Sequence, residues 1–402
     1  MAKTPKIRFK NFSDEWVEHK LGDYFTERVE RSNIGELISV TINSGIRKFY
    51  ELGRHDNSSD DKSNYKRVEI DDIAYNSMRM WQGASGRSPY SGILSPAYTV
   101  IIPKEGINSV FFSYVFKLPN MIYKFKIHSQ GLTTDTWNLK FPAFAEIEAS
   151  KPTIAEQRKI SEFFTKLDKL IALHQSKFEK LQKIKKSCLQ NLFPQNNQNT
   201  PKIRFKNFSD EWVESKLGEI SERITRKNSN LETTLPLTIS SQYGLVDQSA
   251  YFNNRVASLN LSKYYLIKNG EFAYNKSYSD GFPYGSIKRL DNYSKGALST
   301  LYIIFAIKNA IINSNYLQYF YNTKIWHNDV AMVAAEGARN HGLLNITAQD
   351  FFTTNVKFPS NLEEQEKIGA FFSKLDKLIT LHQSKFKKLQ KIKKSCLQNM
   401  FV

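Results

Sequence analysis

Residues 156–193 read EQRKISEFFTKLDKLIALHQSKFEKLQKIKKSCLQNLF, and residues 364–401 repeat them as EQEKIGAFFSKLDKLITLHQSKFKKLQKIKKSCLQNMF. The two stretches are identical at 31 of 38 positions. A second pair lies upstream: TPKIRFKNFSDEWVEHKLG at 4–22 returns at 200–218 with one difference, His19 against Ser215. The chain is therefore two copies of one unit, and such a repeat constrains the architecture more than any short motif.

Between these matched borders the two halves differ strongly. Only short similarities survive, such as DIAYN at 72–76 against EFAYN at 271–275, and GILSPAY at 92–98 against GALSTLY at 296–302. Two scaffolds are alike while the two inserts have diverged. This pattern is typical of a protein that recognises two different targets.

The two matched stretches predict long helices that pair, because apolar residues recur with a seven-residue period. Lys185 and Lys393 interrupt this period at equivalent places. The heptads alone favour a structural brace over a molecular ruler, and the divergent inserts reverse that preference. The predicted seam residues are Ile160, Phe164, Leu167, Ile171, His174, Phe178 and Leu181 in the first copy, and Ile368, Phe372, Leu375, Ile379, His382, Phe386 and Leu389 in the second.

Each helix has a predicted start signal, a capping box at Thr153 with Glu156 and another at Ser360 with Glu363. A helix of 38 residues is roughly 57 Å long at 1.5 Å per residue and needs a long partner. The short polar linker 194–199 places the second domain near the far end of the first helix. The two helices are therefore predicted to run antiparallel.

We expect a mixed α/β protein with two globular domains in pseudo-twofold tandem repeat, separated by two long antiparallel coiled-coil helices. Strand-like runs occur at 37–42, 98–102 and 235–240, and helical stretches are expected near 110–126 and 314–326. The expected segments are a first variable domain at 1–150, a helix at 151–193, a linker at 194–199, a second variable domain at 200–357 and a helix at 358–402.

The charge balance points to a polyanionic partner. The net charge is +18, and clustered Lys and Arg gain affinity for phosphates through counterion release. The run KLQKIKK occurs at 180–186 and again at 388–394. It could follow a DNA backbone or face another subunit, and a solvated helix face explains it equally well.

Several kinds of enzyme are disfavoured by missing motifs. No proline follows Asn or Asp, as the base-holding loop of an amino-methylating DNA methyltransferase requires, and neither a GxxxxGK[ST] loop nor a glycine-rich cofactor turn occurs. The two cysteines and scattered histidines form no metal or disulfide pattern. No signal core or membrane-length apolar run is evident, so we expect a cytoplasmic, non-catalytic protein with no metal site.

The combination of two variable domains, each followed by P-x(3–4)-EQ-x-KI-x(2)-FF-x-KLDKLI and a basic helix, resembles the specificity subunit of type I restriction-modification systems. The resemblance covers essentially the whole chain. The residues that carry it are Pro152, Glu156, Gln157, Lys159, Ile160, Phe163, Leu167, Asp168 and Ile171, with Pro359, Glu364, Gln365, Lys367, Ile368, Phe371, Leu375, Asp376 and Ile379.

The resemblance implies an assembly on double-stranded DNA. Two modification subunits would bind S-adenosylmethionine and methylate adenine, and two restriction subunits would use ATP and Mg²⁺ to translocate and cut DNA. This chain would bind no cofactor itself. Its target-recognition domains would read the two halves of a bipartite, asymmetric site, with the helices setting the unread gap.

Candidate DNA-reading residues are polar and aromatic side chains in the variable domains, because Arg, Asn, Gln and Lys can bond base edges. An ordinary loop role is about as plausible for each one. The candidates are Asn43, Arg47, Lys48, Asn76, Arg79, Trp81, Gln82 and Arg87 in the first domain, and Ser241, Gln242, Tyr243, Asn275, Lys276, Tyr278, Arg339 and Asn340 in the second.

Two other hypotheses remain open at this point. A coiled-coil scaffold for protein partners would bind DNA weakly and without sequence preference. A nuclease hidden in the variable domains would show metal-dependent cleavage by the isolated chain.

Overall fold

The computed structural model describes residues 4–56, 58–195, 198–254, 256–277, 281–308, 310–334 and 344–402. The chain forms two compact units. Unit 1 contains residues 1–175 and 384–402, and unit 2 contains residues 176–383. Each unit therefore combines one half's variable domain with parts of both long helices, a division that differs in kind from the five consecutive segments expected from the sequence.

Unit 1 is built on a four-stranded antiparallel sheet with the order β2-β9-β6-β7. Three two-stranded antiparallel pairs, β3-β4, β5-β8 and β1-β10, surround it. The strands are β1 (Val17–Lys20), β2 (Phe25–Glu27), β3 (Ile38–Thr41), β4 (Gly45–Lys48), β5 (Lys66–Val68), β6 (Ile73–Asn76), β7 (Ser85–Arg87), β8 (Gly92–Leu94), β9 (Tyr98–Pro103) and β10 (Glu148–Lys151).

Unit 2 has the same sheet topology, although its sequence between the matched borders is so different. Its four-stranded sheet has the order β12-β19-β16-β17, and its pairs are β13-β14, β15-β18 and β11-β20. The strands are β11 (Trp212–Lys216), β12 (Ser221–Ile224), β13 (Leu237–Ser240), β14 (Gly244–Asp247), β15 (Tyr265–Lys268), β16 (Phe272–Asn275), β17 (Ser286–Arg289), β18 (Lys295–Leu298), β19 (Ile303–Ile307) and β20 (Asn355–Pro359).

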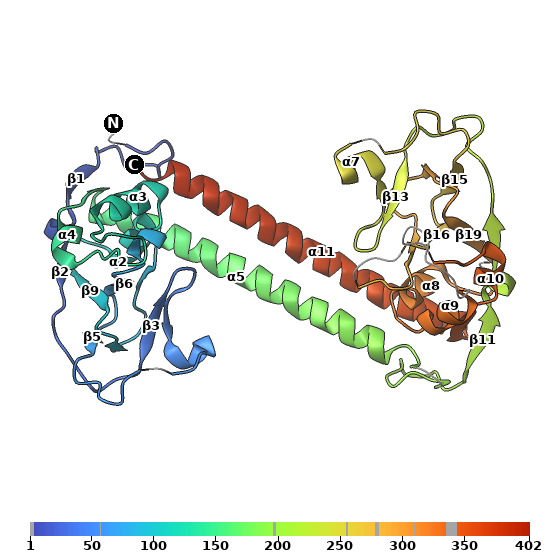
Figure 1. Ribbon diagram of the computed structural model, residues 1–402, viewed down its shortest axis with the longest axis horizontal. Coiled ribbons are helices and arrows are strands. Elements are labelled where there is room, and N and C mark those ends of the chain that lie inside the picture. The colour runs from blue at the N-terminus through green and yellow to red at the C-terminus, as the bar shows by residue number, and fades with distance from the viewer. Residues whose placement is uncertain are drawn as a thin grey trace. The chain divides into compact units, whose positions relative to one another are not determined.

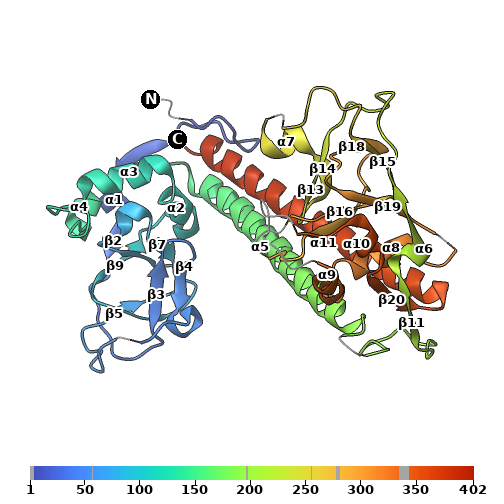
Figure 2. The same cartoon turned by 45° about the vertical axis from the view of Figure 1, so that its right-hand side comes forward.

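Short helices complete each unit. In unit 1, α2, α3 and α4 gather near the start of α5, while β3 and β5 extend away from it (Figures 1 and 2). The short helices are α1 (Leu21–Tyr24), η1 (Phe49–Leu52), η2 (Met80–Gln82), α2 (Ser109–Val115), α3 (Pro119–His128) and α4 (Phe141–Ala145) in unit 1, and α6 (Leu217–Ile220), α7 (Gln248–Phe252), α8 (Ser314–Phe320), α9 (His327–Val333) and α10 (Ala348–Phe352) in unit 2.

Helices form in both stretches where they were expected, near 110–126 and 314–326, but neither stretch is one continuous helix. The first divides into α2 and α3, because Leu118 precedes Pro119 and is extended, with φ at −70° and ψ at 143°. Pro119 then starts α3, where its missing N–H has no helical partner to lose. In the second stretch α8 ends at Phe320, and α9 begins only at His327.

The long helices are α5 (Ile154–Asn191) and α11 (Leu362–Asn399), each of 38 residues. In unit 1, Lys393 of α11 bonds Asp168 of α5, and in unit 2, Lys185 of α5 bonds Asp376 of α11. In unit 1, Phe401, which follows Lys393, packs against Phe164, which precedes Asp168. In unit 2, Phe193 and Phe372 repeat this relation beside Lys185 and Asp376. The predicted antiparallel pairing is therefore confirmed within each unit.

The predicted capping boxes need correction. At the start of α11 the capping side chain is Asn361, whose Oδ1 accepts from the Glu363 N–H at 2.8 Å, and not Ser360. At the start of α5 the Thr153 carbonyl accepts the N–H of Gln157, as a residue before the first turn should. The Glu156 carboxylate, however, is engaged by an arginine from the N-terminal segment.

The end of each long helix completes the core of the other copy's domain. In unit 1, Phe401 packs against Trp16, Phe111 and Phe164. In unit 2, Phe193 packs in the same way against Trp212, Tyr316 and Phe372. Neither variable domain therefore buries its apolar face with its own half of the sequence alone.

Candidate DNA interface and its scaffold

A buried ion pair fixes the N-terminal segment of each unit to its long helix. Arg8 donates from Nε and Nη2 to both oxygens of Glu156 at 2.7 Å, and Arg204 binds Glu364 with the same two distances. Both glutamates are fully buried. The bond to Glu156 raises the pKa of the Arg8 guanidinium above its ordinary value. This bidentate geometry is the strong form of such a pair.

Gln157, the residue after Glu156, holds the loop that precedes α2. Gln157 Oε1 accepts from the Asn108 N–H at 2.9 Å, and its Nε2 donates to the carbonyls of Gly106 and Pro152. Gln365 makes the equivalent bond to the Asn313 N–H at 2.7 Å. The Glu-Gln pair of the repeated motif is therefore a structural anchor within each unit.

The repeated aspartate bridges the two long helices and the variable domain. In unit 1, Asp168 accepts from Lys393 at 2.5 Å and from the Tyr114 hydroxyl at 2.9 Å. Burial, and then the Asp168 charge, raise the pKa of Tyr114. In unit 2, Asp376 accepts in the same way from Lys185 and from Tyr319, at 2.6 and 3.0 Å. The polar breaks in the heptads are thus cross-helix ion pairs.

The seam residues follow the predicted face. In the first copy Ile160, Phe164 and Leu167 are buried, and in the second their equivalents are buried too. Further along each helix burial becomes partial. The half-buried seam residues are Ile171, His174, Phe178, Leu181, Ile379, His382, Phe386 and Leu389, and the buried residues of the second copy are Ile368, Phe372 and Leu375.

The hairpin β3-β4 carries the first group of candidate reading residues. Asn43 is exposed in its turn. Arg47 pairs with Glu51 at 3.0 Å and is half-exposed, and Lys48 pairs with Glu36 at 2.7 Å. Arg47 and Lys48 thus each have an acidic partner, so the exposed Asn43 is the candidate of this hairpin with the most freedom to reach a base.

A second group follows β6, in the turn that contains η2. Asn76 ends the strand, and its Oδ1 accepts from the Met78 N–H at 3.0 Å. Trp81 donates to the Met78 carbonyl and packs edge-on against Trp137. Arg79 lies 3.9 Å from the exposed Asp135, and Gln82 is exposed. This turn therefore presents an arginine and an amide beside a fixed aromatic pair.

Arg87 behaves differently from its neighbours in the sequence. Its Nε donates to Asp71 at 2.6 Å from the end of β7. The pair is partly exposed, with the arginine side chain 30% exposed. Arg87 therefore has a structural role, since it joins the end of β7 to Asp71. Its contact with DNA stays a prediction.

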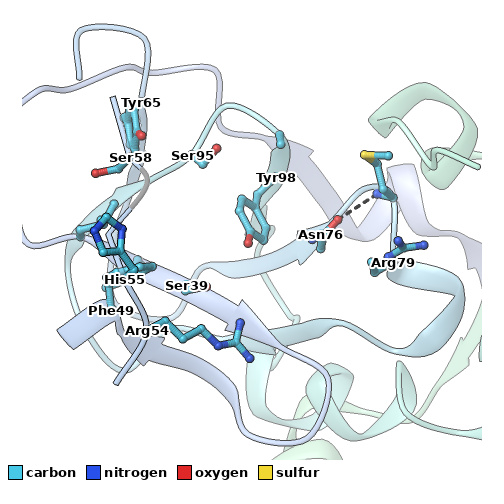
Figure 3. Close-up of a pocket in the computed structure, with 14 residues that line it drawn as sticks. Ser39, Phe49, Arg54, His55, Ser58, Tyr65, Asn76, Arg79, Ser95 and Tyr98 are labelled. Atoms are coloured by element: carbon cyan, nitrogen blue, oxygen red, sulfur yellow. Dashed lines mark hydrogen bonds between the residues drawn. The ribbon is translucent and has the colours of Figure 1, made fainter. Parts of the chain in front are cut away.

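A cavity of about 450 Å³ lies beside these segments in unit 1. Figure 3 shows Asn76 and Arg79 at one side of it, with Tyr98 between them and Ser39, Arg54 and His55. Arg54 and His55 follow the left-handed Gly53 that ends η1. Sequence reasoning missed Arg54, His55 and Tyr98, because only the folded hairpin brings residues 39–58 beside residues 76–98.

In unit 2 the corresponding positions recur at the same places in the fold. Asn275 ends β16, and its Oδ1 accepts from the Ser277 N–H at 3.0 Å, as Asn76 does from Met78. Gln242 and Tyr243 are exposed in the β13-β14 turn. Lys276 is tied by its Nζ to the Ile346 carbonyl at 3.2 Å.

Three further candidates, Tyr278, Arg339 and Asn340, lie outside the described residues. Ser241, the remaining candidate of unit 2, is half-buried, with its Oγ 3.5 Å from that of Ser286. A cavity of about 560 Å³ adjoins its turn, and is lined by Gln242, Asn322 and Lys324 together with the end of α5. The DNA contacts of all these candidates stay predictions.

Other kinds of site are not visible in the described ranges. There, no three His, Cys, Asp or Glu side chains come together as metal ligands would. Within the same ranges, no helix has the length and apolar character needed to cross a membrane.

The fold defines a class: a protein with two units of equal sheet topology, each an α/β domain built together with parts of two long helices. Residues 13–185 match the family model of the type I restriction modification DNA specificity domain. The second half repeats the first in its scaffold sequence and its sheet order. The first half of the chain is thus similar to a DNA sequence-specificity domain, and the internal repeat extends this similarity to the second half.

Solved structures share this fold. The chain is similar to the S subunit of a type I restriction-modification system from M. genitalium, with a TM-score of 0.59, 14% identity and 99% of both chains covered. It is also similar to the HsdS subunit from Thermoanaerobacter tengcongensis, with a TM-score of 0.45, 13% identity and 96% of each chain covered. The M. genitalium structure supports two domains and two long helices as the fold.

Proposed function

We propose that each variable domain reads one half of a bipartite, asymmetric DNA site. The observation that carries this proposal is equal topology with different reading side chains. The β3-β4 turn presents Asn43 where the β13-β14 turn presents Gln242 and Tyr243. Two such surfaces would bond different base edges.

In this proposal the chain determines which DNA sequence the complex binds, and it catalyses no reaction itself. Two modification subunits carry S-adenosylmethionine and methylate adenine, and two restriction subunits carry ATP and Mg²⁺. The specificity family is non-catalytic in general. The purified chain alone is therefore expected to show no methyl transfer with S-adenosylmethionine and no DNA cleavage with a divalent metal.

The decisive experiment exchanges the block 23–150 for the recognition domain of another specificity subunit. The complex with the modification partner is then expressed, and the methylated sequence is determined by methylome sequencing. One half of the methylated site should change while the other half stays the same. A change in both halves would overturn reading by two separate modules.

A matched exchange of the block 219–354 serves as the control. It should change the other half of the site and leave the first half as it was. If both exchanges abolish methylation, thermal unfolding of the complexes distinguishes misfolding from loss of reading. Folded complexes that bind DNA without any sequence preference would contradict the proposal.

A further inference from the structure

The loop after α2 carries a lysine that joins two of the candidate reading segments. The Lys117 ammonium donates to the carbonyl of Ile42 at 3.0 Å and also to the carbonyl of Gly83. Ile42 adjoins Asn43 in the β3-β4 turn, and Gly83 ends η2, which contains Trp81. One side chain thus connects three segments that are distant in the sequence.

This lysine differs from the many solvated ones on the surface. It is half-buried, and desolvation lowers the pKa of its ammonium to about 8. Burying an ammonium is unfavourable unless its hydrogen bonds are satisfied. Two backbone carbonyls meet that need here, so the arrangement is a specific one.

In the second domain the position equivalent to Lys117 is an asparagine. Asn108 caps α2 and Asn313 caps α8 in the same way. Lys117 is nine residues after the first cap, and Asn322 is nine residues after the second. Alignment of the two domains therefore places Asn322 opposite Lys117, so the second domain has no lysine at this position.

In the second domain a lysine on a strand, Lys288, bonds this asparagine. Lys288 on β17 donates to Asn322 Oδ1 at 3.2 Å. Burial is also the main cause that lowers the pKa of Lys288 to about 8. In strand register Lys288 faces Ala273, as Gly86 of the first domain faces Ala74. The second domain therefore has its lysine at the position of Gly86 and an asparagine at the position of Lys117.

This difference has a steric reason in the first domain. A Cβ added to Gly86 would lie 2.9 Å from the Gly45 Cα and 3.0 Å from the Ile46 nitrogen. The β3-β4 hairpin lies so close to β7 that no side chain fits at this position. A lysine at position 86, the equivalent of Lys288, is therefore excluded in the first domain.

In the second domain the acceptor of the Lys288 ammonium lies close to the β13-β14 turn. Asn322, its acceptor, lines a cavity together with Gln242 of the β13-β14 turn. Ser241 of that turn approaches Ser286 of β17 to 3.5 Å between their hydroxyl oxygens. Lys288 is thus linked to the β13-β14 turn through Asn322, whereas Lys117 bonds the β3-β4 turn directly.

We propose that Lys117 is a positioning residue for DNA reading that holds the β3-β4 turn against the loop behind it, and that Lys288 does the same for the second domain indirectly, by fixing Asn322 beside the β13-β14 turn. The inference rests on the proposed function, since it takes each domain to read its own half-sequence. A hairpin turn held in one place loses less conformational freedom when it meets a base edge.

The test uses the complete complex with its modification partner and a DNA library in which each half-site carries single mismatches. The measured quantity is the ratio of methylation rates between matched and mismatched sites. Lys117→Met should lower this ratio about tenfold in the first half, comparable to the loss of one base contact, and leave the second half unchanged. Lys288→Met should do the reverse.

A matched control is Lys104→Met. The Lys104 ammonium also donates to a backbone carbonyl, that of Gly22 at 2.7 Å, outside the reading segments. This variant should leave both ratios unchanged. Its loss of discrimination equal to that of Lys117→Met would overturn the proposal, because any lysine tied to the backbone would then act alike.

A rescue variant guards against a purely structural explanation. Lys288→Gly should lose discrimination in the second half, and Lys288→Gly with Asn322→Lys installs the first domain's arrangement and should regain most of it. Unchanged discrimination in folded Lys117→Met and Lys288→Met complexes would overturn the inference. Equal loss in both halves from either variant would instead contradict two-module reading, and with it the proposed function.

Discussion

Arg8 and Glu156 are separated by 148 residues in the sequence and form a two-bond ion pair in which the carboxylate is fully buried. The pair joins the repeated N-terminal segment to the start of α5. Arg204 and Glu364 form its counterpart in unit 2. Two segments that recur almost unchanged in the sequence therefore meet in the fold.

Replacing the arginine should be costly because it leaves a carboxylate buried without its charge partner. We expect Arg8→Met to destabilise unit 1 by about 3–5 kcal/mol, measured by denaturant unfolding. Arg204→Met should do the same in unit 2. Lys20→Met, which breaks the exposed pair with Glu146, is the control and should leave the unfolding midpoint unchanged. A small effect of Arg8→Met would show that Glu156 is protonated or hydrated after the change.

The end of α11 should matter to the first variable domain, despite its distance in sequence. Phe401→Ala removes a ring that packs against Phe111 and Phe164. We expect a loss of about 3–5 kcal/mol in unit 1. Hydrogen exchange read out by mass spectrometry should show faster exchange in α2 and little change in α8. Equal acceleration in both helices would contradict a local role.

The buried lysines predict how stability depends on pH. Burial lowers the pKa of Lys288 from 10.5 to about 8 in the folded chain. Between these two values the unfolded chain binds more protons, so this residue makes stability rise as the pH increases through that window. Lys288→Met removes the effect. The melting temperature of the variant relative to the original chain should be higher at pH 7 than at pH 9, and the opposite trend would count against a desolvated ammonium.

The long helices could be predicted because a heptad pattern is local and occurs twice. The capping at α11 could not, since Ser360 and Asn361 are both good caps and the backbone decides between them. The role of Glu156 also escaped prediction, because its partner Arg8 lies in a different repeated segment.

The candidate reading surface was predictable only in part, for a related reason. Asn76 and Arg79 stand out as polar residues after a strand, and both line the cavity of Figure 3. Arg54 and His55 line it as well, but no local pattern distinguishes them from other loop residues. Lys117 owes its position to contacts with two distant turns, and a sequence does not show which turns meet.

The last prediction concerns the helices as a ruler between the two half-sites. From Asp168 to Lys185 the chain advances 17 residues along α5, and their partners Lys393 and Asp376 lie 17 residues apart in the opposite direction along α11. Extrapolating this register, the peptide bond after Gln175 faces the one after Lys385. Insertions at these two points should therefore extend both helices without disturbing either ion pair.

Seven residues inserted at each point would preserve the heptad pattern and lengthen each helix by roughly 10 Å. At about 3.4 Å per base pair, the unread gap should grow by about three base pairs. Both half-sequences should stay the same, and methylome sequencing would show the new gap directly. A seven-residue insertion in α5 alone is the control, and should reduce methylation because the helices no longer match. An active double variant with an unchanged gap would refute the ruler and leave the helices as a brace.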